Sequence, residues 1–466
     1  MKQIKFNEQL SQEQIVNFLK NYGFVFPDSE IYGGLANTWD FGPLGVLLKR
    51  NIKNLWWNEF VTKDPQTVGI DSAIINNPKI WKASGHLVNF SDPLIECKNC
   101  HNRFRADKLI NDSVKNAKIT EQTSFVQLEK MITDNKISCP ICKQTNWAPI
   151  HKFNLMFQIH QGILADDHSI NYLRPETAQG IFVNFLNVQR SLRLKIPFGI
   201  AQIGKSFRNE ITPGNFIFRT REFEQMELEY FVNPNEADKT FEFLLKKIKN
   251  FLSTKLKIND KNLFFREHQK DELSHYSKRT VDIEFAFPHG KKELWGIANR
   301  TDFDLNAHSK HAKTDLVYFD STTNKKIVPF VIEPSVGVER LFYAVIVDKY
   351  RIEKINDNET REVLHLPLAL APYKIAVLPL VNKLSKDAKM IYESLVEQGL
   401  EATYDVTGSI GKRYRRQDAI GTPYCLTFDF DSLTSKTVTI RDRDTMKQKR
   451  ISISEIVDYL QEANHA

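Results

Sequence analysis

The chain has 466 residues, of which 41% are hydrophobic and 26% are charged, and its formal net charge is +7. This length exceeds that of one ordinary hydrophobic core, so two or three domains are expected, and the composition is that of a globular protein rather than of a disordered or membrane-embedded one. The mild positive charge is compatible with a polyanionic partner but does not establish one.

The chain contains no stretch of about 18 apolar residues of the kind that spans a membrane. Residues 1–10 are polar and carry no apolar signal core. We therefore expect a cytoplasmic protein without a membrane partner.

An amphipathic helix is expected to begin at Pro43, because proline is tolerated in the first turn of a helix. Apolar residues then recur at spacings of three and four and mark one helix face. They are Leu44, Leu48, Ile52, Leu55, Trp56 and Phe60.

Residues 91–150 form a polar segment whose composition differs from its surroundings, as is typical of an insertion. It contains two Cys-x-x-Cys pairs, Cys97 with Cys100 and Cys139 with Cys142. Four thiolates complete a tetrahedral structural zinc site, and residues 101–138 would be a folded excursion between its two halves. Four plain thiols are the alternative. The fifth cysteine, Cys425, lies in an expected strand and reads as a small buried hydrophobe.

Two strands are expected at 198–207 and 221–231, joined by a loop that contains the turn signal Pro213-Gly214-Asn215. Side chains alternate along a strand. One face of the second strand would therefore carry Arg221, Phe223, Gln225, Glu227 and Glu229. The other would carry Glu222, Glu224, Met226, Leu228 and Tyr230. Neither face is simply apolar, which suits an ATP site but also a solvated strand with surface ion pairs, and composition does not separate the two.

The Lys-rich residues 233–280 are expected to be a helical insertion, followed by strands at 281–303 and 328–333 and an apolar helix at 337–348. The charged, aperiodic residues 354–362 mark a boundary. We therefore expect a first domain at 1–365 and a second at 366–466. Alternating strands and helices in the second predict a small α/β domain.

A basic stretch in the second domain places charges beside an aromatic ring. Its members are Lys412, Arg413, Tyr414, Arg415 and Arg416. Phosphate contacts combined with base stacking are typical of single-stranded RNA recognition. A solvated helix face is the alternative.

Three segments resemble the signature motifs of class II aminoacyl-tRNA synthetases. Phe207-Arg208-Asn209-Glu210, a loop and then Arg219-Thr220-Arg221-Glu222-Phe223 resemble motif two. The segment from Pro334 to Arg340 resembles motif three, and the segment around Pro43 resembles motif one. The strings at 37–45, 174–180, 300–305, 333–335 and 408–423 are similar to those of the homodimeric glycyl branch of the family.

The resemblance implies an α+β fold, in which a class II antiparallel-sheet catalytic domain with the two insertions precedes a C-terminal α/β anticodon-binding domain. It also implies ATP, glycine and tRNA(Gly) as substrates, Mg²⁺ used with ATP, a homodimer, and attachment of glycine to tRNA(Gly) through a glycyl-adenylate.

Site residues carry over from the motifs. The catalytic ones would be Arg208, Arg340 and Glu176. ATP would be bound by Arg208, Asn209, Glu210, Phe218, Arg219, Thr220, Arg221, Glu222, Phe223, Glu293, Leu294, Gly337, Val338, Glu339 and Arg340. Glycine would be bound by Arg105, Glu176, Phe223, Glu224, Gln225, Met226, Glu227, Arg300, Glu333, Pro334, Ser335, Val336 and Gly337. Within these sets Phe223 and Arg340 would sandwich the adenine, and the carboxylates would surround the ammonium.

Two other functions remain open at this level. One is a class II enzyme for another small amino acid, such as threonine, serine or proline. The other is a non-catalytic nucleic-acid-binding protein on a synthetase scaffold. The joint presence of Arg208, Phe223 and Arg340 favours catalysis, because a binding module has no need of them.

Overall fold

The computed structural model describes residues 10–465 except for 116, 118, 120–122, 163–168, 275 and 322. The polar opening segment 1–9 lies outside the described residues. Among the helices of the described part, none is long and apolar enough to cross a membrane.

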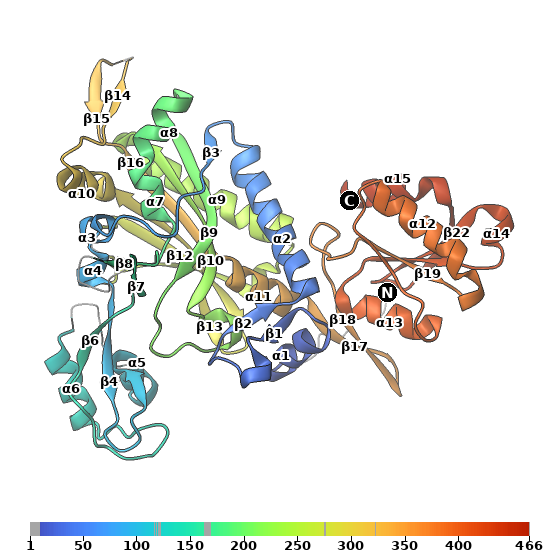
Figure 1. The fold of residues 1–466 in the computed structure, drawn as a ribbon, viewed down its shortest axis with the longest axis horizontal. Helices are drawn as coiled ribbons and strands as arrows, with labels where there is room; N and C mark the ends of the chain where they lie inside the picture. The colour runs from blue at the N-terminus through green and yellow to red at the C-terminus, as the bar shows by residue number, and fades with distance from the viewer. Residues whose placement is uncertain are drawn as a thin grey trace.

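A seven-stranded sheet forms the centre of the larger domain, with the order β11-β12-β13-β16-β10-β9-β3 (Figure 1). Its strands are β3 Thr67–Gly69, β9 Phe198–Phe207, β10 Glu222–Val232, β11 Leu263–Glu267, β12 Arg279–Phe287, β13 Gly290–Thr301 and β16 Phe330–Gly337. All neighbours are antiparallel except β3 and β9. The expected antiparallel-sheet fold is confirmed.

Four helices cover one face of this sheet and share its largest hydrophobic core. They are α1 Gln12–Asn21, α2 Pro43–Trp57, α9 Ala237–Asn250 and α11 Val338–Lys349. In α2, Pro43 stands in the first turn, and Leu48, Ile52 and Trp56 are fully buried, as the spacing predicted. The amphipathic pattern thus fixes how α2 lies on the sheet.

The opposite face of the sheet is polar at its centre and apolar at one end. At that end α7 Ala178–Val183, α8 Phe185–Leu192 and α10 Phe303–Ala312 pack on Phe231 and its neighbours. Along β10, Met226 and Leu228 point into the main core, whereas Glu227 and Glu229 point to the polar face. The predicted alternation of β10 is confirmed.

The expected helical insertion at 233–280 is wrong in its second half. Helix α9 is present, but it packs beneath the sheet, and residues 263–267 form the edge strand β11. Leu263 enters the main core, and Arg266 pairs with Asp282 of the neighbouring β12 at 2.8 Å. The segment is therefore part of the sheet and its cover.

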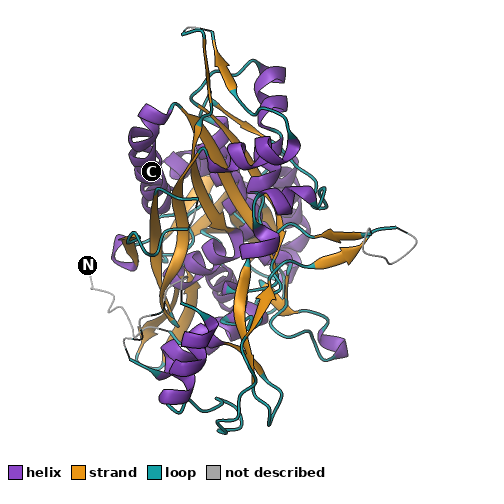
Figure 2. Ribbon diagram, turned by 90° about the vertical axis from the view of Figure 1, so that its left-hand side faces the viewer, coloured by secondary structure: helices purple, strands orange, loops and turns teal. Residues whose placement is uncertain are grey.

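The Cys-containing segment folds around a small core of its own. Strands β4 Ser91–Glu96, β5 Arg103–Arg105 and β6 His151–Asn154 form a three-stranded sheet, with α5 Ala106–Ser113 and α6 Phe125–Asp134 packed beside it. In both views it projects from the lower end of the larger domain (Figure 1, Figure 2).

Several short elements complete the larger domain. They are β1 Val25–Pro27, β2 Trp39–Phe41, α3 Lys79–Ala83, α4 His86–Asn89, β7 Gln158–His160, β8 Ile170–Tyr172, β14 Tyr318–Asp320 and β15 Lys325–Ile327. The hairpin β14–β15 projects at the end opposite to the Cys-containing segment (Figure 1).

A hairpin, β17 Tyr350–Asn356 and β18 Glu359–Leu364, occupies the charged segment where the sequence showed no regular pattern. It lies between the larger domain and the C-terminal domain (Figure 1). That second domain is a five-stranded mixed sheet in the order β20-β19-β21-β22-β23. Its elements are β19 Ile375–Pro379, α12 Ser385–Glu397, β20 Ala402–Tyr404, α13 Ile410–Ile420, β21 Tyr424–Phe428, α14 Ser432–Ser435, β22 Thr437–Asp442, β23 Gln448–Ser452 and α15 Ile456–His465.

Candidate functional site

A cavity opens on the polar face of the large sheet, where β10, the loop 208–221 and the start of α11 meet. It is lined by Arg208, Glu210, Ile217, Phe218, Arg219, Thr220, Phe223, Gln225, Glu293, Leu294, Ser335, Gly337, Glu339 and Arg340. Most of these were predicted as ATP contacts from segments far apart in the sequence. The fold thus brings the motif-two, motif-three and Glu293 segments to one place.

The loop 208–221 is held in position by the segment that precedes β2. The side-chain amide of Asn37 donates to the backbone oxygens of Phe216 and Arg219 at 3.0 and 2.8 Å. Trp39 packs edge-on against Phe216, with ring centroids 4.7 Å apart. The cationic side chain of Arg219 lies 3.6 Å from Glu210. Burial lowers the pKa of Arg219, opposed by Glu210 and reinforced by Arg105 and Arg340. An anion bound in the cavity would offset the repulsion between Arg219 and the neighbouring arginines.

Two arginines flank the cavity from opposite sides. Arg208 lies between the rings of Phe223 and Phe90, at 5.3 and 5.4 Å from their centroids, and its Nε donates to the oxygen of Pro175. Arg340 lies 4.5 Å from the ring centroid of Phe218 and pairs with Glu293 at 3.1 Å. Arg340 therefore lies against Phe218, and both Arg340 and Phe223 border the cavity, so the adenine sandwich expected between these two stays a prediction.

Next to the cavity, the side chain of Glu227 is buried, with an exposed fraction of 2%, and its carboxylate accepts four hydrogen bonds. Ser335 Oγ and Gln225 Nε2 donate to one carboxylate oxygen at 2.7 and 2.9 Å, and both the backbone N–H and the hydroxyl of Thr177 donate to the other. Burial and the neighbouring Glu176 raise the pKa of Glu227. These donors fix its orientation.

Glu176 lies beside Glu227 and is held in its charged form. Burial by itself would raise the pKa of the Glu176 carboxyl, but His86, Arg300 and Gln179 outweigh it, and the pKa is well below its ordinary value. The imidazole of His86 is 3.4 Å from its oxygen, and the amide of Gln179 donates at 3.0 Å.

Arg300 closes the other end of this carboxylate group. Its guanidinium donates two bonds to Asp304, at 2.8 and 2.9 Å, and one bond to Glu333 at 2.6 Å. The ring of Tyr276 lies 4.0 Å from it. Glu333 receives only one arm of this fork. Burial, opposed by Arg300 and reinforced by Glu227 and Glu176, raises its pKa to about 8.

Glu229 is a further carboxyl that sequence reasoning placed on the correct face but assigned no role. It is fully buried, and neither of its oxygens has a hydrogen-bond partner among the described residues. Burial, followed by the charge of Glu333, raises its pKa well above the ordinary value. Glu229 therefore favours its neutral, protonated form and adds no fixed negative charge to the group.

Four polar side chains that orient the carboxylates were not predicted as site residues. Thr177, Gln179 and Asp304 lie in the strings at 174–180 and 300–305 that resemble the glycyl branch, so these three residues could have been predicted from the sequence. His86 lies in α4, far from any quoted motif, and the sequence offered no signal for it.

Several predicted site residues point away from the cavity, because they lie on the other face of their strand. Glu224 pairs with Lys49 and Lys53 of α2 at 2.6 and 2.9 Å. The side chains of Met226, Val336, Val338 and Leu294 are buried in the main core. Glu222 pairs with Lys205 at the surface. Of these residues only Leu294 borders the cavity. A contact of the others with ATP or glycine would have to use their backbone, and it stays a prediction.

Arg105, predicted to contact glycine, is engaged within the Cys-containing segment. It pairs with Asp92 at 3.0 Å and with Asp107 at 2.7 Å. The charge of Glu210 also acts on its pKa, which is raised although burial alone would lower it. Arg105 is thus held by carboxylates of its own segment and lies within the electrostatic influence of Glu210 in the motif-two segment, and its contact with glycine stays a prediction.

The four predicted zinc ligands converge on one point. The sulfur atoms of Cys97, Cys100, Cys139 and Cys142 all lie within 4.8 Å of one another. The sulfurs of Cys97 and Cys142 are 3.5 Å apart, and those of Cys100 and Cys139 are 3.6 Å apart. Zinc–sulfur bonds of about 2.3 Å in a tetrahedron require sulfur separations of roughly 3.8 Å. The arrangement fits a zinc ion, whereas Cys425 is fully buried in the other domain, as expected.

The basic stretch forms helix α13, and its members differ in accessibility. Arg413 is 2% exposed, and its guanidinium donates to the backbone oxygens of Pro379, Leu380 and Asp405. Its predicted RNA contact is therefore wrong, because the helix turns it inward. The hydroxyl of Tyr414 bonds Thr427 and its ring lies under Arg441. Lys412 is exposed, whereas Arg415 and Arg416 are half-buried and ion-paired, Arg415 with Glu359 and Asp418 and Arg416 with Asp405; all three cations border a shallow cavity.

Two family matches cover most of the chain. Residues 161–350 match the family described as tRNA synthetase class II core domain (G, H, P, S and T), and residues 374–463 match the family described as anticodon binding domain. The residues between these matches include most of the hairpin β17–β18.

Curated proteins named glycine--tRNA ligase are similar to this chain along nearly its whole length. The one from Ureaplasma urealyticum is 59% identical over 98% of both chains. The one from Malacoplasma penetrans is 58% identical over 97% of both. The one from Ruminiclostridium cellulolyticum is 56% identical over 97% of this chain and 98% of its own.

Proposed function

The chain belongs to the glycine--tRNA ligase family of class II tRNA synthetases, and from this premise we propose that it joins glycine to tRNA(Gly) in two steps. In the first, a carboxylate oxygen of glycine bonds to the α-phosphorus of ATP, and the bond to pyrophosphate breaks. In the second, a hydroxyl at the 3′ end of the tRNA attacks the glycyl carbonyl carbon, and AMP leaves. No side chain acts as a covalent nucleophile, so positioning and charge stabilisation supply the rate.

The observation that carries this function is the meeting of the arginine-lined cavity with the buried carboxylates at Glu227. Arg208 and Arg219 supply cations for the phosphates, and Phe223 and Arg340 border the same cavity. Arg208 stabilises the charge that develops on the α-phosphoryl group during attack. Aromatic rings and the guanidinium plane of Arg340 offer surfaces on which adenine stacks.

Glycine has no side chain, so its selection depends on excluding larger amino acids. The ammonium is placed among Glu176, Glu227 and Glu333, and Ser335 stands next to the α-carbon. Ser335 donates to Glu227 at 2.7 Å, and Glu227 accepts further hydrogen bonds from Thr177 and Gln225. Moving either side chain to make room for a methyl group would break these hydrogen bonds. A rigid polar wall of this kind rejects alanine more strongly than an apolar pocket, which separates one methylene by about 1–3 kcal/mol.

Class II synthetases use ATP with Mg²⁺, and the chain offers an oxygen donor for it beside the cavity. The carboxylate of Glu293 would hold the ion, which when bound neutralises the departing pyrophosphate. In the structure Glu293 pairs with Arg340, which keeps its pKa below the ordinary value although burial alone would raise it. Glu293 is therefore present as a carboxylate ready for a hard cation.

The four cysteines of the projecting segment bind one structural zinc ion in this proposal. Four ligands leave no open position for catalysis, so the ion stabilises the segment and takes no part in the reaction. The four sulfur atoms already lie close enough together to bind one ion, so the segment would not have to refold to bind zinc.

A homodimer formed through the N-terminal region completes the proposal. The segment between β1 and β2 exposes large apolar side chains next to α2, the helix that resembles motif one. Ile31 and Tyr32 are 88% and 86% exposed, and Leu35 and Val46 are also more than half exposed. A patch of this kind is typical of a protein–protein contact.

For tRNA, the C-terminal domain offers the exposed Lys412 and the half-buried Arg415 and Arg416 of α13, which border one shallow cavity. Phosphate contacts there would be salt-dependent and independent of base sequence. The cytoplasmic location remains a prediction.

Glycine-dependent exchange of labelled pyrophosphate into ATP tests the proposed function directly. We expect exchange with glycine and at most traces with alanine, serine, threonine or proline, followed by charging of tRNA(Gly). Exchange with another amino acid would support the alternative specificity. Complete absence of exchange from folded protein would support a non-catalytic binding role.

A further inference from the structure

The hairpin β17–β18 joins the two domains and belongs to neither family match, apart from its first residue. It continues directly from α11, the helix that carries Arg340 at its start. On its other side β18 packs against α13 of the C-terminal domain. The hairpin is thus the covalent and spatial connection between the site of activation and the helix that offers cations to RNA.

The side of the hairpin that faces the larger domain is anchored through Glu362. Its carboxylate accepts hydrogen bonds from Tyr22, the residue that follows α1, at 2.9 Å, and from Tyr350, at 2.5 Å. The ring of Tyr350 stacks on Phe18 of α1 with centroids 3.9 Å apart. This side of β18 therefore cannot shift without breaking contacts in the catalytic domain.

The neighbouring residue Arg361 points to the opposite side, because side chains alternate along a strand. One arm of its guanidinium donates to Asp418 of α13 at 3.0 Å and to the backbone oxygen of Arg443 at 2.9 Å. The rest of the fork binds Glu353 of β17 at 2.6 to 2.8 Å. The side chain of Arg361 is only 2% exposed, so these bonds are shielded from water.

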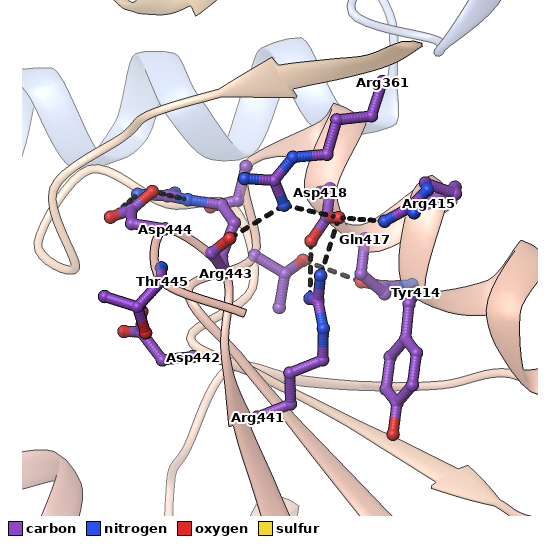
Figure 3. Close-up of polar contacts among 12 residues, drawn as sticks. Arg361, Tyr414, Arg415, Gln417, Asp418, Arg441, Asp442, Arg443, Asp444 and Thr445 are labelled. Atoms are coloured by element: carbon purple, nitrogen blue, oxygen red, sulfur yellow. Dashed lines mark hydrogen bonds and ion pairs between the residues drawn. The ribbon is translucent and has the colours of Figure 1, made fainter. Parts of the chain in front are cut away.

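Asp418 is the centre of this interdomain network (Figure 3). It is fully buried, and besides Arg361 it accepts two bonds from Arg441, at 2.7 and 3.0 Å, and one from Arg415 at 3.4 Å. Arg415 also reaches Glu359 at the start of β18, at 3.1 Å. One carboxylate therefore joins the hairpin, the sheet of the C-terminal domain and the RNA-facing side of α13.

Buried ion pairs add little net stability, because desolvation offsets their attraction, but they tolerate only one geometry. Arginine in particular holds several acceptors at fixed angles. We infer that the Arg361–Asp418 pair fixes the angle between the two domains and so positions tRNA for the transfer of glycine, while the activation of glycine does not depend on it. Arg361 is then a positioning residue for the second step. The inference rests on the proposed function.

The test compares Arg361→Gln with wild type in three assays. After this change Asp418 keeps Arg441 and Arg415, and Glu353 keeps His365 at 2.8 Å, so neither carboxylate is left alone. We expect glycine-dependent pyrophosphate exchange within about twofold of wild type, and kcat/KM for charging full-length tRNA at least about tenfold lower. Charging of an RNA hairpin that contains only the acceptor arm should be unchanged, because that substrate does not reach the C-terminal domain.

Lys354→Gln is the matched control. It removes the same charge from the same hairpin, but Lys354 is largely exposed and, within the described part of the chain, its ion pair is with Asp357. It should leave all three assays as in wild type.

Charging of full-length tRNA by Arg361→Gln within twofold of wild type would overturn the inference. So would an equal loss with full-length tRNA and with the acceptor hairpin, because the pair would then act on the catalytic domain itself. If Arg361→Gln also loses exchange, the milder Arg361→Lys decides. A loss of at least about threefold confined to full-length tRNA supports the inference, and an equal loss in all assays rejects it. Absence of exchange in wild type would instead refute the proposed function.

Discussion

The pKa of Glu333 makes the binding of glycine depend on pH in a direction that can be measured. Burial, opposed by Arg300 but reinforced by Glu227 and Glu176, raises this pKa to about 8. The side chain is then mostly protonated at neutral pH in the free protein. A cationic ammonium binds the ionised form more tightly, so glycine binding releases a proton and strengthens as the pH rises towards 8.

The size of the effect follows from the fraction of Glu333 that is ionised. With a pKa of about 8 this fraction is roughly 0.01 at pH 6, 0.1 at pH 7 and one half at pH 8. The apparent affinity scales with the fraction of protein that is competent to bind. The KM for glycine should therefore fall about tenfold between pH 6 and pH 7, and about fivefold more by pH 8.

Pyrophosphate exchange at saturating ATP and varied glycine measures this KM across the range, with the KM for ATP as internal reference. Glu333→Gln keeps the shape of the side chain but cannot ionise. We expect its KM for glycine to be nearly flat with pH and at least about tenfold above that of wild type at pH 8, because a charge-assisted hydrogen bond contributes roughly 1.5–3 kcal/mol.

His86→Gln is the control for this profile. His86 lies 3.4 Å from Glu176, so its replacement alters the surroundings of the neighbouring carboxylate and leaves Glu333 itself in place. The slope should survive this change. A glycine KM in wild type that is constant between about pH 6 and pH 8, or a slope that persists in Glu333→Gln and disappears in His86→Gln, would refute the reasoning.

Four further results are expected. Arg208→Ala should lower exchange by about 100-fold or more while thermal unfolding stays close to wild type, because it removes a cation from the α-phosphoryl group; near-normal exchange would show that the assignment is wrong. Ser335→Ala should raise the glycine KM far more than the ATP KM and admit alanine as a weak substrate; parallel shifts of both constants, with alanine still excluded, would contradict the pocket. Metal analysis should find one zinc per chain in wild type and none in Cys139→Ser, and a zinc-free wild type would remove the metal from the proposal. Light scattering at micromolar concentration should find a dimer in wild type and monomers in Tyr32→Asp, and a fully active wild-type monomer would exclude the dimer.

Local patterns in the sequence determined much of the fold and of the site. The spacing of Leu48, Ile52 and Trp56 predicted which face of α2 is buried, and the structure confirms it. The alternation in β10 placed Gln225, Glu227 and Glu229 on one face. The two Cys-x-x-Cys pairs predicted four thiols that meet at one point. Each of these features depends on a period of two or 3.6 residues, or on a short spacing, which is visible in sequence.

Only the tertiary structure decided which of the motif residues face the ligand. Glu224 and Met226, predicted to contact glycine, directly follow the motif-two string. The side chain of Glu224 binds Lys49 and Lys53, and that of Met226 fills the core, because neighbours on a strand point in opposite directions. Arg413 belongs to a basic run, yet the rotation of α13 turns it inward. A sequence motif does not show which side chains face a ligand until the elements that pack against its strand or helix are known.

Long-range pairing was equally invisible in sequence. Strand β11 exists because β12 supplies its hydrogen bonds, and the charged hairpin β17–β18 is ordered by α1 on one side and α13 on the other. Neither segment has a strong period of its own. The charges that marked residues 354–362 as a domain boundary include Arg361, which is buried because Asp418, 57 positions later, neutralises it. The sequence determined the chemistry of the chain, whereas the burial of its charges was decided by partners that only folding brings together.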